Sequence, residues 1–119
     1  MYARGARAVR LRSRMPSLES LHRLLDASPQ DPFVPYAIAQ EHARQRAFAE
    51  AVAWFDRCLA IDAAYCYAYY HKARALVAMG LQVDALRTID EGQRRATASG
   101  DAHAAAELTT LREEIEAEP

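Results

Sequence analysis

The segment FAEAVAWFDRCLAID, residues 48–62, decides the fold, because its pattern returns 34 residues later. After a shift of 34 positions, small residues fall on small ones and large apolar residues on large apolar ones: Ala51 on Ala85, Cys58 on Gly92, Val52 on Leu86 and Phe55 on Ile89. Within the segment, apolar residues recur every three or four positions, which is typical of a helix with one buried face. A fixed period of this length indicates stacked helical units.

The same shift extends to the residues before this segment, where Ala39 falls on Ala73, Tyr36 on Tyr70 and Phe33 on Tyr67. Each unit therefore contains two helices. Gly80 and Gly100 are natural stops at helix C-termini, and Asp101 is a strong N-cap. We expect six helices, over residues 17–27, 33–45, 48–62, 64–79, 83–98 and 101–118.

Composition agrees with a helical protein. The chain has 119 residues, of which 51% are hydrophobic, with only 4 glycines and 5 prolines. We expect one helical repeat domain over 17–119, preceded by a disordered basic tail over 1–16. The domain would consist of a lone capping helix (17–29), a first repeat (32–63), a second repeat (64–98) and a C-terminal capping helix (101–118). A helix pair of this size buries its apolar face only when pairs stack, and the end helices need a polar outer side.

The first 14 residues contain five arginines and no acidic residue. This pattern is compatible with a transit peptide, a basic arm for an acidic partner, a disordered tail, or a true translation start at Met15. The rest of the chain holds 10 basic and 16 acidic side chains, hence a net charge of −6. Such a body is a poor candidate for binding nucleic acid.

With these residues, the sequence resembles a tetratricopeptide repeat (TPR) protein, of the small single-domain bacterial type. In the second helix of each unit, the family's alanine and large apolar residue are matched by Ala51 and Phe55 and by Ala85 and Ile89. In the first helix of the second unit, the two aromatic positions are matched by Tyr69 and Leu76, and the closing proline of the lone N-terminal helix by Pro29. The chain departs from the family pattern at Pro35, at Ile38-Ala39, at Lys72-Ala73 and at Ala63. The resemblance implies an all-α fold, a right-handed α-solenoid of antiparallel helix hairpins with about six helices.

In this family the first helix of each pair lines a concave groove, and the second forms the outer wall. That geometry predicts a peptide-binding groove lined by Phe33, Tyr36, Gln40, Arg44, Tyr67, Tyr70, His71 and Arg74. Tyr69, by contrast, faces its partner helix and is expected to be core. An alternative remains open, in which the final helix lies across part of the groove and uses these aromatics as ordinary core.

Aromatic side chains with arginine are typical of protein-interface hot spots. We therefore expect a protein partner that presents a peptide or C-terminal segment, possibly acidic, to these residues. Chaperone-binding relatives hold a terminal carboxylate with Lys, Asn and Arg, but the matching positions here include Asp101, which would repel it. That specific clamp is not expected.

Catalytic chemistry has no signature in the sequence. No glycine-rich phosphate loop, HExxH motif or Cys/His cluster is present, so we expect no catalytic residues, cofactor or metal. Cys58 fits a close helix contact, and Cys66 is expected to be partly exposed. Trp54 would rest against the previous hairpin or form an exposed patch for self-association.

The sequence thus predicts a cytoplasmic, non-enzymatic adaptor, a scaffold-type protein that binds a peptide segment of a partner in its groove. It predicts no binding to nucleic acid through the folded body and none to membranes. The alternative is a structural module that forms homo-oligomers. We expect Ala51→Glu or Ala85→Glu to destroy the fold in either case, because each would bury a charge.

Overall fold

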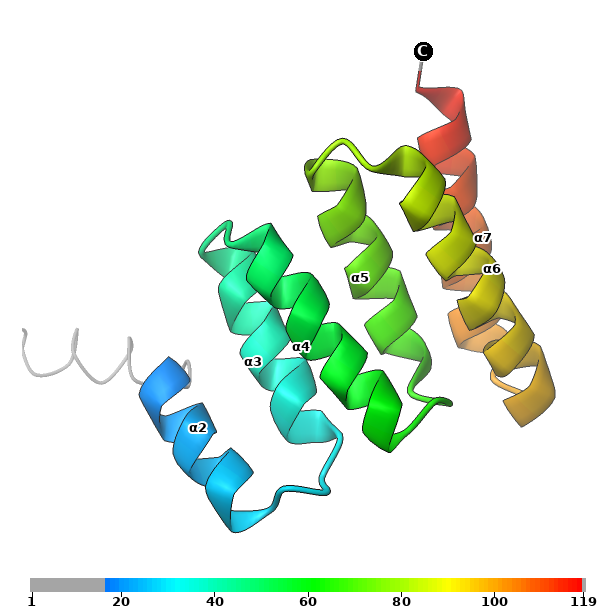
Figure 1. Cartoon of the computed structure of the whole chain (residues 1–119). Coiled ribbons are helices and arrows are strands. Elements are labelled where there is room, and N and C mark those ends of the chain that lie inside the picture. Colours follow the sequence, from blue (N-terminus) through cyan, green and yellow to red (C-terminus); the bar gives the residue numbers. More distant parts are fainter. Residues whose placement is uncertain (1–16, 119) are drawn as a thin grey trace, which may run out of the picture.

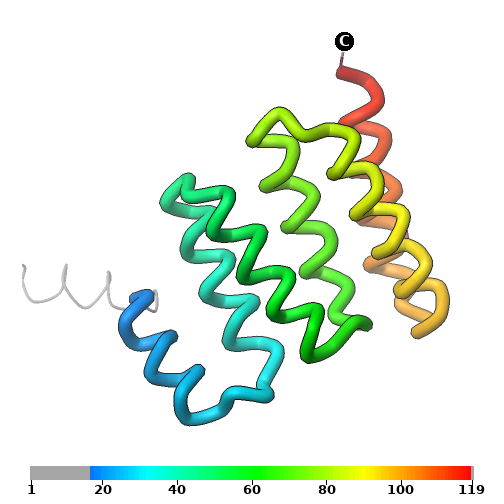
Figure 2. Tube along the Cα trace, viewed as in Figure 1, coloured from blue at the N-terminus to red at the C-terminus, as the bar shows by residue number. Residues whose placement is uncertain are grey.

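The computed structural model describes residues 17–118, which form six helices and no strand. Their bounds are α2 Leu18–Ala27, α3 Phe33–Arg44, α4 Phe48–Ile61, α5 Cys66–Ala78, α6 Gln82–Ser99 and α7 Ala102–Ala117. Short turns join them, so each helix runs antiparallel to the one before it (Figures 1 and 2). The predicted all-α fold is confirmed, and the helix bounds differ from those expected by two residues at most. The predictions for residues 1–16 lie outside the described residues.

The helices form two rows. Every helix contacts its neighbours in sequence, and α5 also contacts α3 and α7. In the described part of the chain, α4 and α6 do not approach each other to within 8 Å between Cα atoms. Consequently α3, α5 and α7 form a tight inner row, and α4 and α6 form a looser outer row, as in a curved α-solenoid (Figure 1).

Side-chain caps and glycine turns set the helix ends. The Ser17 hydroxyl accepts a hydrogen bond from the Ser20 N–H at 3.1 Å, and the Asp101 carboxylate accepts one from the Ala104 N–H at 3.0 Å. Gly80 and Gly100 have φ values of 78° and 72°, in the left-handed region that glycine adopts without strain. Both stops and the Asp101 cap agree with the sequence predictions.

Small residues let the helices approach closely. Ala39, Ala51, Ala73 and Ala85 are all 0% exposed, and they occupy the equivalent positions identified from the 34-residue shift. Around them, large apolar side chains fill the interior, with Phe55 of α4 and Ile89 of α6 also at 0%. The repeat in the sequence is therefore a repeat in the packing.

Gly92 of α6 lies where α5 and α7 approach this helix closely. A Cβ atom at this position would lie 2.7 Å from the Tyr69 Cβ and 3.0 Å from a Leu108 methyl group. Tyr69 is 6% exposed, and its hydroxyl donates to the Ala63 carbonyl at 2.8 Å. The expectation that Tyr69 is core is confirmed.

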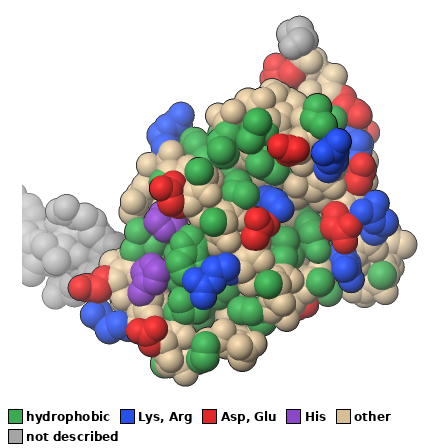
Figure 3. Space-filling view, viewed as in Figure 1, with side chains coloured by type: hydrophobic (Ala, Val, Ile, Leu, Met, Phe, Trp, Pro, Cys, Tyr) green, Lys and Arg blue, Asp and Glu red, His purple; other side chains and the backbone are tan. Residues whose placement is uncertain are grey.

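The outer surface over α6 and α7 carries acidic and basic side chains in mixture (Figure 3). Among the ion pairs there, Arg94 and Arg95 both bind Glu91, and Arg112 binds Asp90. Within residues 17–118, no helix combines the length and the apolar character that crossing a bilayer requires.

Candidate functional site

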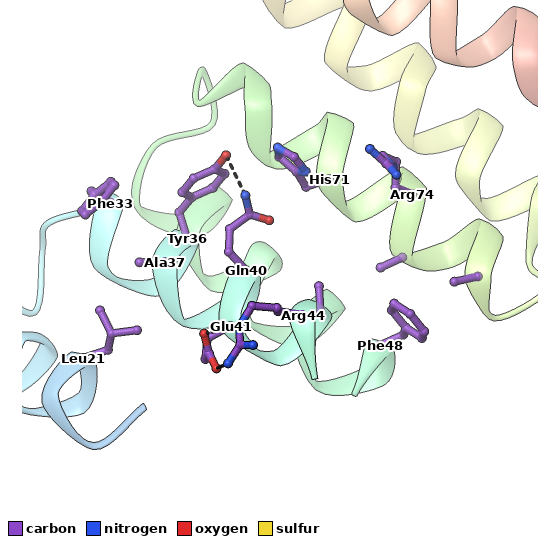
Figure 4. A pocket seen from close by; sticks show the side chains of 13 residues that line it. Leu21, Phe33, Tyr36, Ala37, Gln40, Glu41, Arg44, Phe48, His71 and Arg74 are labelled. Carbon is purple, nitrogen blue, oxygen red and sulfur yellow. Dashed lines mark hydrogen bonds and ion pairs between the residues drawn. The ribbon is translucent and has the colours of Figure 1, made fainter. Parts of the chain in front are cut away.

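A groove of about 660 Å³ lies between α3 and α5 on the inner row (Figure 4). Because α3 and α5 are both inner-row helices, side chains from successive repeats meet along it. Its lining residues come from α2, α3, the start of α4, and α5: Leu21, Phe33, Tyr36, Ala37, Gln40, Glu41, Ala43, Arg44, Phe48, His71, Arg74, Ala75 and Ala78. Apolar and aromatic groups predominate, with a few polar groups among them, which is the usual composition of a binding site.

The structure brings six of the eight predicted site residues together in this groove. They are Phe33, Tyr36, Gln40 and Arg44 from α3, and His71 and Arg74 from α5. In Figure 4, Phe33 lies at one side of the row and Arg74 at the other, with Tyr36, Gln40 and His71 between them. Whether these residues bind a peptide stays a prediction, but they do share one cavity.

Tyr67 and Tyr70 do not line this groove. The centroid of the Tyr67 ring lies 6.3 Å from that of the His103 ring, and Tyr67 packs beside Ala104 of α7. This arrangement matches the alternative expectation that the final helix uses the aromatics for packing. Tyr70 is half-buried against the core between α5, α6 and α7, and the Arg74 guanidinium lies 5.9 Å from its ring centroid. The sequence prediction assigned both tyrosines to the groove because it could not show where α7 packs, and it is α7 that covers them.

Tyr36 is the centre of the aromatic wall. Its ring lies 5.0 Å from the Tyr65 ring, 5.8 Å from that of His71 and 5.9 Å from that of Phe55, all between centroids. Burial raises the pKa of Tyr36 to about 12, and the nearby Tyr65 contributes to this shift. The hydroxyl therefore keeps its proton at neutral pH. It accepts a 3.4 Å hydrogen bond from the Gln40 amide and remains able to donate one.

His71 lies among aromatic rings. Its imidazole stacks on Phe55 at 6.2 Å and meets Tyr70 edge-on at 5.0 Å, between ring centroids. Burial lowers the pKa of His71, the positive charge of Arg74 lowers it further, and Glu107 acts weakly in the opposite direction. At neutral pH His71 is therefore an uncharged aromatic surface rather than a cation.

Among the groove residues that the sequence prediction missed, Glu41 is the one that carries a charge. It is only 7% exposed, and its carboxylate binds Arg44 through two hydrogen bonds of 3.0 and 2.5 Å and Gln45 at 2.8 Å. The hydrogen bonds from Arg44 lower the pKa of Glu41. The three-residue spacing of Glu41 and Arg44 is visible in the sequence, but it is equally common on exposed helix faces. Nothing in the sequence marks this pair as belonging to the groove.

The Glu41–Arg44 pair changes the charge of the predicted site. Arg44 was expected to be available for a carboxylate of the ligand, but its guanidinium already holds one. Arg74 remains: it is exposed, and among the described residues no carboxylate lies within 4 Å of its guanidinium nitrogens. The groove therefore presents a mostly neutral aromatic surface on α3 and a single available cation on α5.

Trp54 and the cysteines lie outside the groove. The Trp54 indole of α4 is half-buried and meets the His22 ring edge-on, with 5.3 Å between the ring centroids. It therefore rests against α2, the helix before this hairpin, which is one of the two expected positions. Cys58 and Cys66 are both buried. The expectation that Cys66 is partly exposed was wrong, because Ala96 of α6 and Ala104 of α7 cover it.

Comparisons with known proteins agree with the helical arrangement. No family model and no curated protein matches the sequence. Among solved structures, the crystal structure of a tetratricopeptide repeat domain protein from Salinibacter ruber is 30% identical, covering 72% of this chain and 96% of its own, with a TM-score of 0.66. A solution NMR structure of a TPR domain protein from the same organism is also 30% identical, covering 75% and 90%, with a TM-score of 0.69.

The TPR2B domain of yeast Sti1 is 22% identical, covers 92% of this chain and 89% of its own, and superimposes with a TM-score of 0.81. Stacked antiparallel hairpins with an inner-row groove define an α-solenoid of the helical-repeat class. Together with the Salinibacter ruber relatives, they identify the family. The chain belongs to the tetratricopeptide repeat family.

Proposed function

We propose that this protein is a non-enzymatic interaction module that binds a peptide segment of another protein in the groove between α3 and α5. One observation carries the proposal: the groove has a volume of about 660 Å³ and combines an aromatic wall with Arg74, which forms no ion pair with any described carboxylate. Phe33 at its edge is 54% exposed, a large apolar surface left open to water. Such surfaces are typical of interaction sites.

The protonation states in the groove favour binding over catalysis. Tyr36 keeps its proton, and the carboxylate of Glu41 is held by Arg44. A general acid or base needs a pKa near the working pH and access to the substrate. Cys58 is a poor nucleophile, because burial and the charge of Asp62 raise its pKa to about 12. These groups offer hydrogen bonds and contact area instead.

The proposed ligand is a peptide or C-terminal segment with an apolar side chain and an acidic group. The apolar side chain would cover Phe33 and Tyr36, and the acidic group would pair with Arg74, whose planar guanidinium suits a carboxylate. The solved TPR2B domain of Sti1 is described as a complex with pHsp70, which supports a protein partner for this fold. A cytoplasmic scaffold role is part of the same proposal.

A selection from a displayed library of random 12-residue peptides against the full chain tests the proposal. Affinities of the enriched peptides are then measured by fluorescence polarisation for the wild type, Phe33→Ser and Val83→Ser. Both residues are exposed, Phe33 in the groove and Val83 at 65% on α6 outside it, so neither change should unfold the protein. Circular dichroism confirms this for each variant.

We expect Phe33→Ser to weaken binding about fivefold to tenfold, since the loss of an aromatic contact at an interface costs about 1–1.4 kcal/mol. Val83→Ser should bind like the wild type. The proposal is wrong if no peptide is enriched, or if both variants bind the enriched peptides as well as the wild type does.

A further inference from the structure

The groove continues beyond α5. A second cavity, of about 250 Å³, lies between α5 and α7. It is lined by Arg74, Val77, Ala78, Leu111, Glu114, Ile115 and Glu118. Arg74 and Ala78 line both cavities, so the inner surface is continuous from α2 across α3 and α5 to α7. A segment that passes over Arg74 would meet the wall formed by α7.

The charge of this surface changes from helix to helix. On α3, the Glu41–Arg44 pair cancels its own charge, and the surface is aromatic. On α5, Arg74 is the available cation. On α7, Glu107 and Glu114 are seven residues apart, which places them on one side of the helix, and Glu118 follows at the C-cap of the helix.

The positions of these acidic residues relative to α5 follow from their contacts. Glu107 lies 3.3 Å from the His103 imidazole, and it is near enough to α5 to add a small upward contribution to the pKa of Tyr67, which burial mainly raises, and to oppose the lowering of the pKa of His71. Glu114 and Glu118 line the second cavity opposite Arg74. Within the described residues, no Lys, Arg or His nitrogen lies within 4 Å of either carboxylate. Among the described residues, Glu114 and Glu118 thus present negative charge without an ion-pair partner to the continuous groove.

We propose that this groove selects segments of a partner protein in which an apolar residue, an acidic residue and a basic residue follow in that order, in either chain direction. This inference rests on the proposed function and specifies its ligand. The apolar side chain covers the aromatic surface of α3, the acidic side chain pairs with Arg74, and the basic side chain pairs with Glu114 on α7. If the acidic and basic residues of the segment were exchanged, the basic one would face Arg74 on α5 and the acidic one would face Glu114 on α7, and both contacts would be repulsive.

Selectivity is the main effect of such pairs. Exposed ion pairs add little affinity, but a like-charge contact is unfavourable, so charge order discriminates among peptides with equal apolar content. A wholly acidic segment satisfies Arg74 but meets the negative wall of α7. A wholly basic segment satisfies the carboxylates of α7 but is repelled by the positive charge of Arg74. Only a segment with both charges in the right order complements the whole surface.

Charge reversal at single positions tests this order. The displayed peptide library is selected separately against the full-length wild type, Arg74→Glu, Glu114→Lys and Glu113→Lys. Glu113 is the matched control, because it precedes Glu114 on α7, is exposed, and does not line the second cavity. Circular dichroism verifies that each variant is folded.

We expect the wild-type pool to show an apolar, an acidic and a basic residue in that order, or in the reverse order, along the peptide. The pool for Arg74→Glu should exchange the acidic residue for a basic one, and the pool for Glu114→Lys should lose its basic residue. A wild-type peptide should bind each of these two variants about fivefold to tenfold more weakly at low salt, and bind Glu113→Lys unchanged.

The outcomes separate the two proposals. In one outcome, Phe33→Ser binds the enriched peptides more weakly, but the peptides selected by all four baits have the same charges. This outcome leaves the proposed function intact and overturns the charge order. An effect of Glu113→Lys equal to that of Glu114→Lys overturns the role of the α7 wall. A library without any enriched peptide overturns the proposed function, and this inference with it.

Discussion

Arg46 and Gly80 occupy the same position in successive hairpins, 34 residues apart, and both have a positive φ, of 64° and 78°. In each turn, the N–H of the following residue closes the helix end: that of Ala47 donates to the His42 carbonyl at 2.8 Å, and that of Leu81 to the Leu76 carbonyl at 2.9 Å. The two turns are the same structure, but only one has the residue that adopts it without strain.

Replacing Arg46 with glycine should therefore stabilise the protein. A residue with a Cβ atom in the left-handed region costs about 1–2 kcal/mol, from which the lost contact between the guanidinium and the Phe48 ring must be subtracted. We expect a net gain of about 0.5–1 kcal/mol in the free energy of unfolding, measured by urea denaturation. Arg46→Ala is the control, since it loses the same contact and keeps the strain. Equal stabilities of the two variants would contradict this account.

Enlarging Gly92 should destabilise the protein. A valine there would press against the Tyr69 Cβ and Leu108, and overpacking typically costs about 1–3 kcal/mol, more than the helix propensity it gains. Ala98→Val, at an exposed position of the same helix, is the control. Thermal denaturation should show a clearly lower midpoint for Gly92→Val only. An unchanged midpoint would mean that α5 and α6 are not in close contact at this point.

Burying a carboxylate at either repeat alanine should abolish the fold. Ala51→Glu and Ala85→Glu each place a charge where no surface is accessible, at a cost that exceeds about 3 kcal/mol. Ala53→Glu on the exposed face of α4 should be tolerated. Circular dichroism and urea denaturation measure the result. Cooperative unfolding of both buried variants with wild-type stability would refute the helix packing described here.

Acidification should weaken the fold through His71. Its pKa in the folded state lies below the ordinary value of 6.5, so the unfolded chain binds a proton more readily. The unfolding free energy should consequently decrease as the pH falls below about 6.5 towards the folded-state pKa. His71→Phe should flatten this dependence between pH 7.5 and 5.5 in urea denaturation series. A variant with the same slope as the wild type would assign the effect to other groups.

Sedimentation equilibrium at several concentrations addresses the alternative of self-association. Trp54, the side chain proposed for that role, is half-buried against α2. We expect the mass of a single chain at every dilution. A mass that increases with concentration would favour the structural module, and Trp54→Ala would then show whether this residue is involved.

The sequence predicts the helices and their packing well because both depend on local pattern. The 34-residue shift identified Ala51, Ala85 and Gly92 as close contacts, and Gly80 and Asp101 as helix ends, from residue size and cap chemistry alone. The groove depended on tertiary geometry. The contact of Tyr67 with α7, and the burial of Glu41 beneath Arg44, are decided by where neighbouring helices lie, and no periodicity in the chain reports that.

The inner position of α5 has a consequence for how stability and the proposed specificity can vary independently. This helix contacts α3, α4, α6 and α7, and it carries both fully buried residues such as Ala73 and the exposed Arg74. Adjacent residues are thus under opposite constraints. A larger side chain at Ala73 would clash with its neighbours, whereas a substitution at Arg74 changes the charge of the groove surface and leaves the packing intact. On the proposed function, the charge preference of the groove can therefore be altered at Arg74 without a loss of stability.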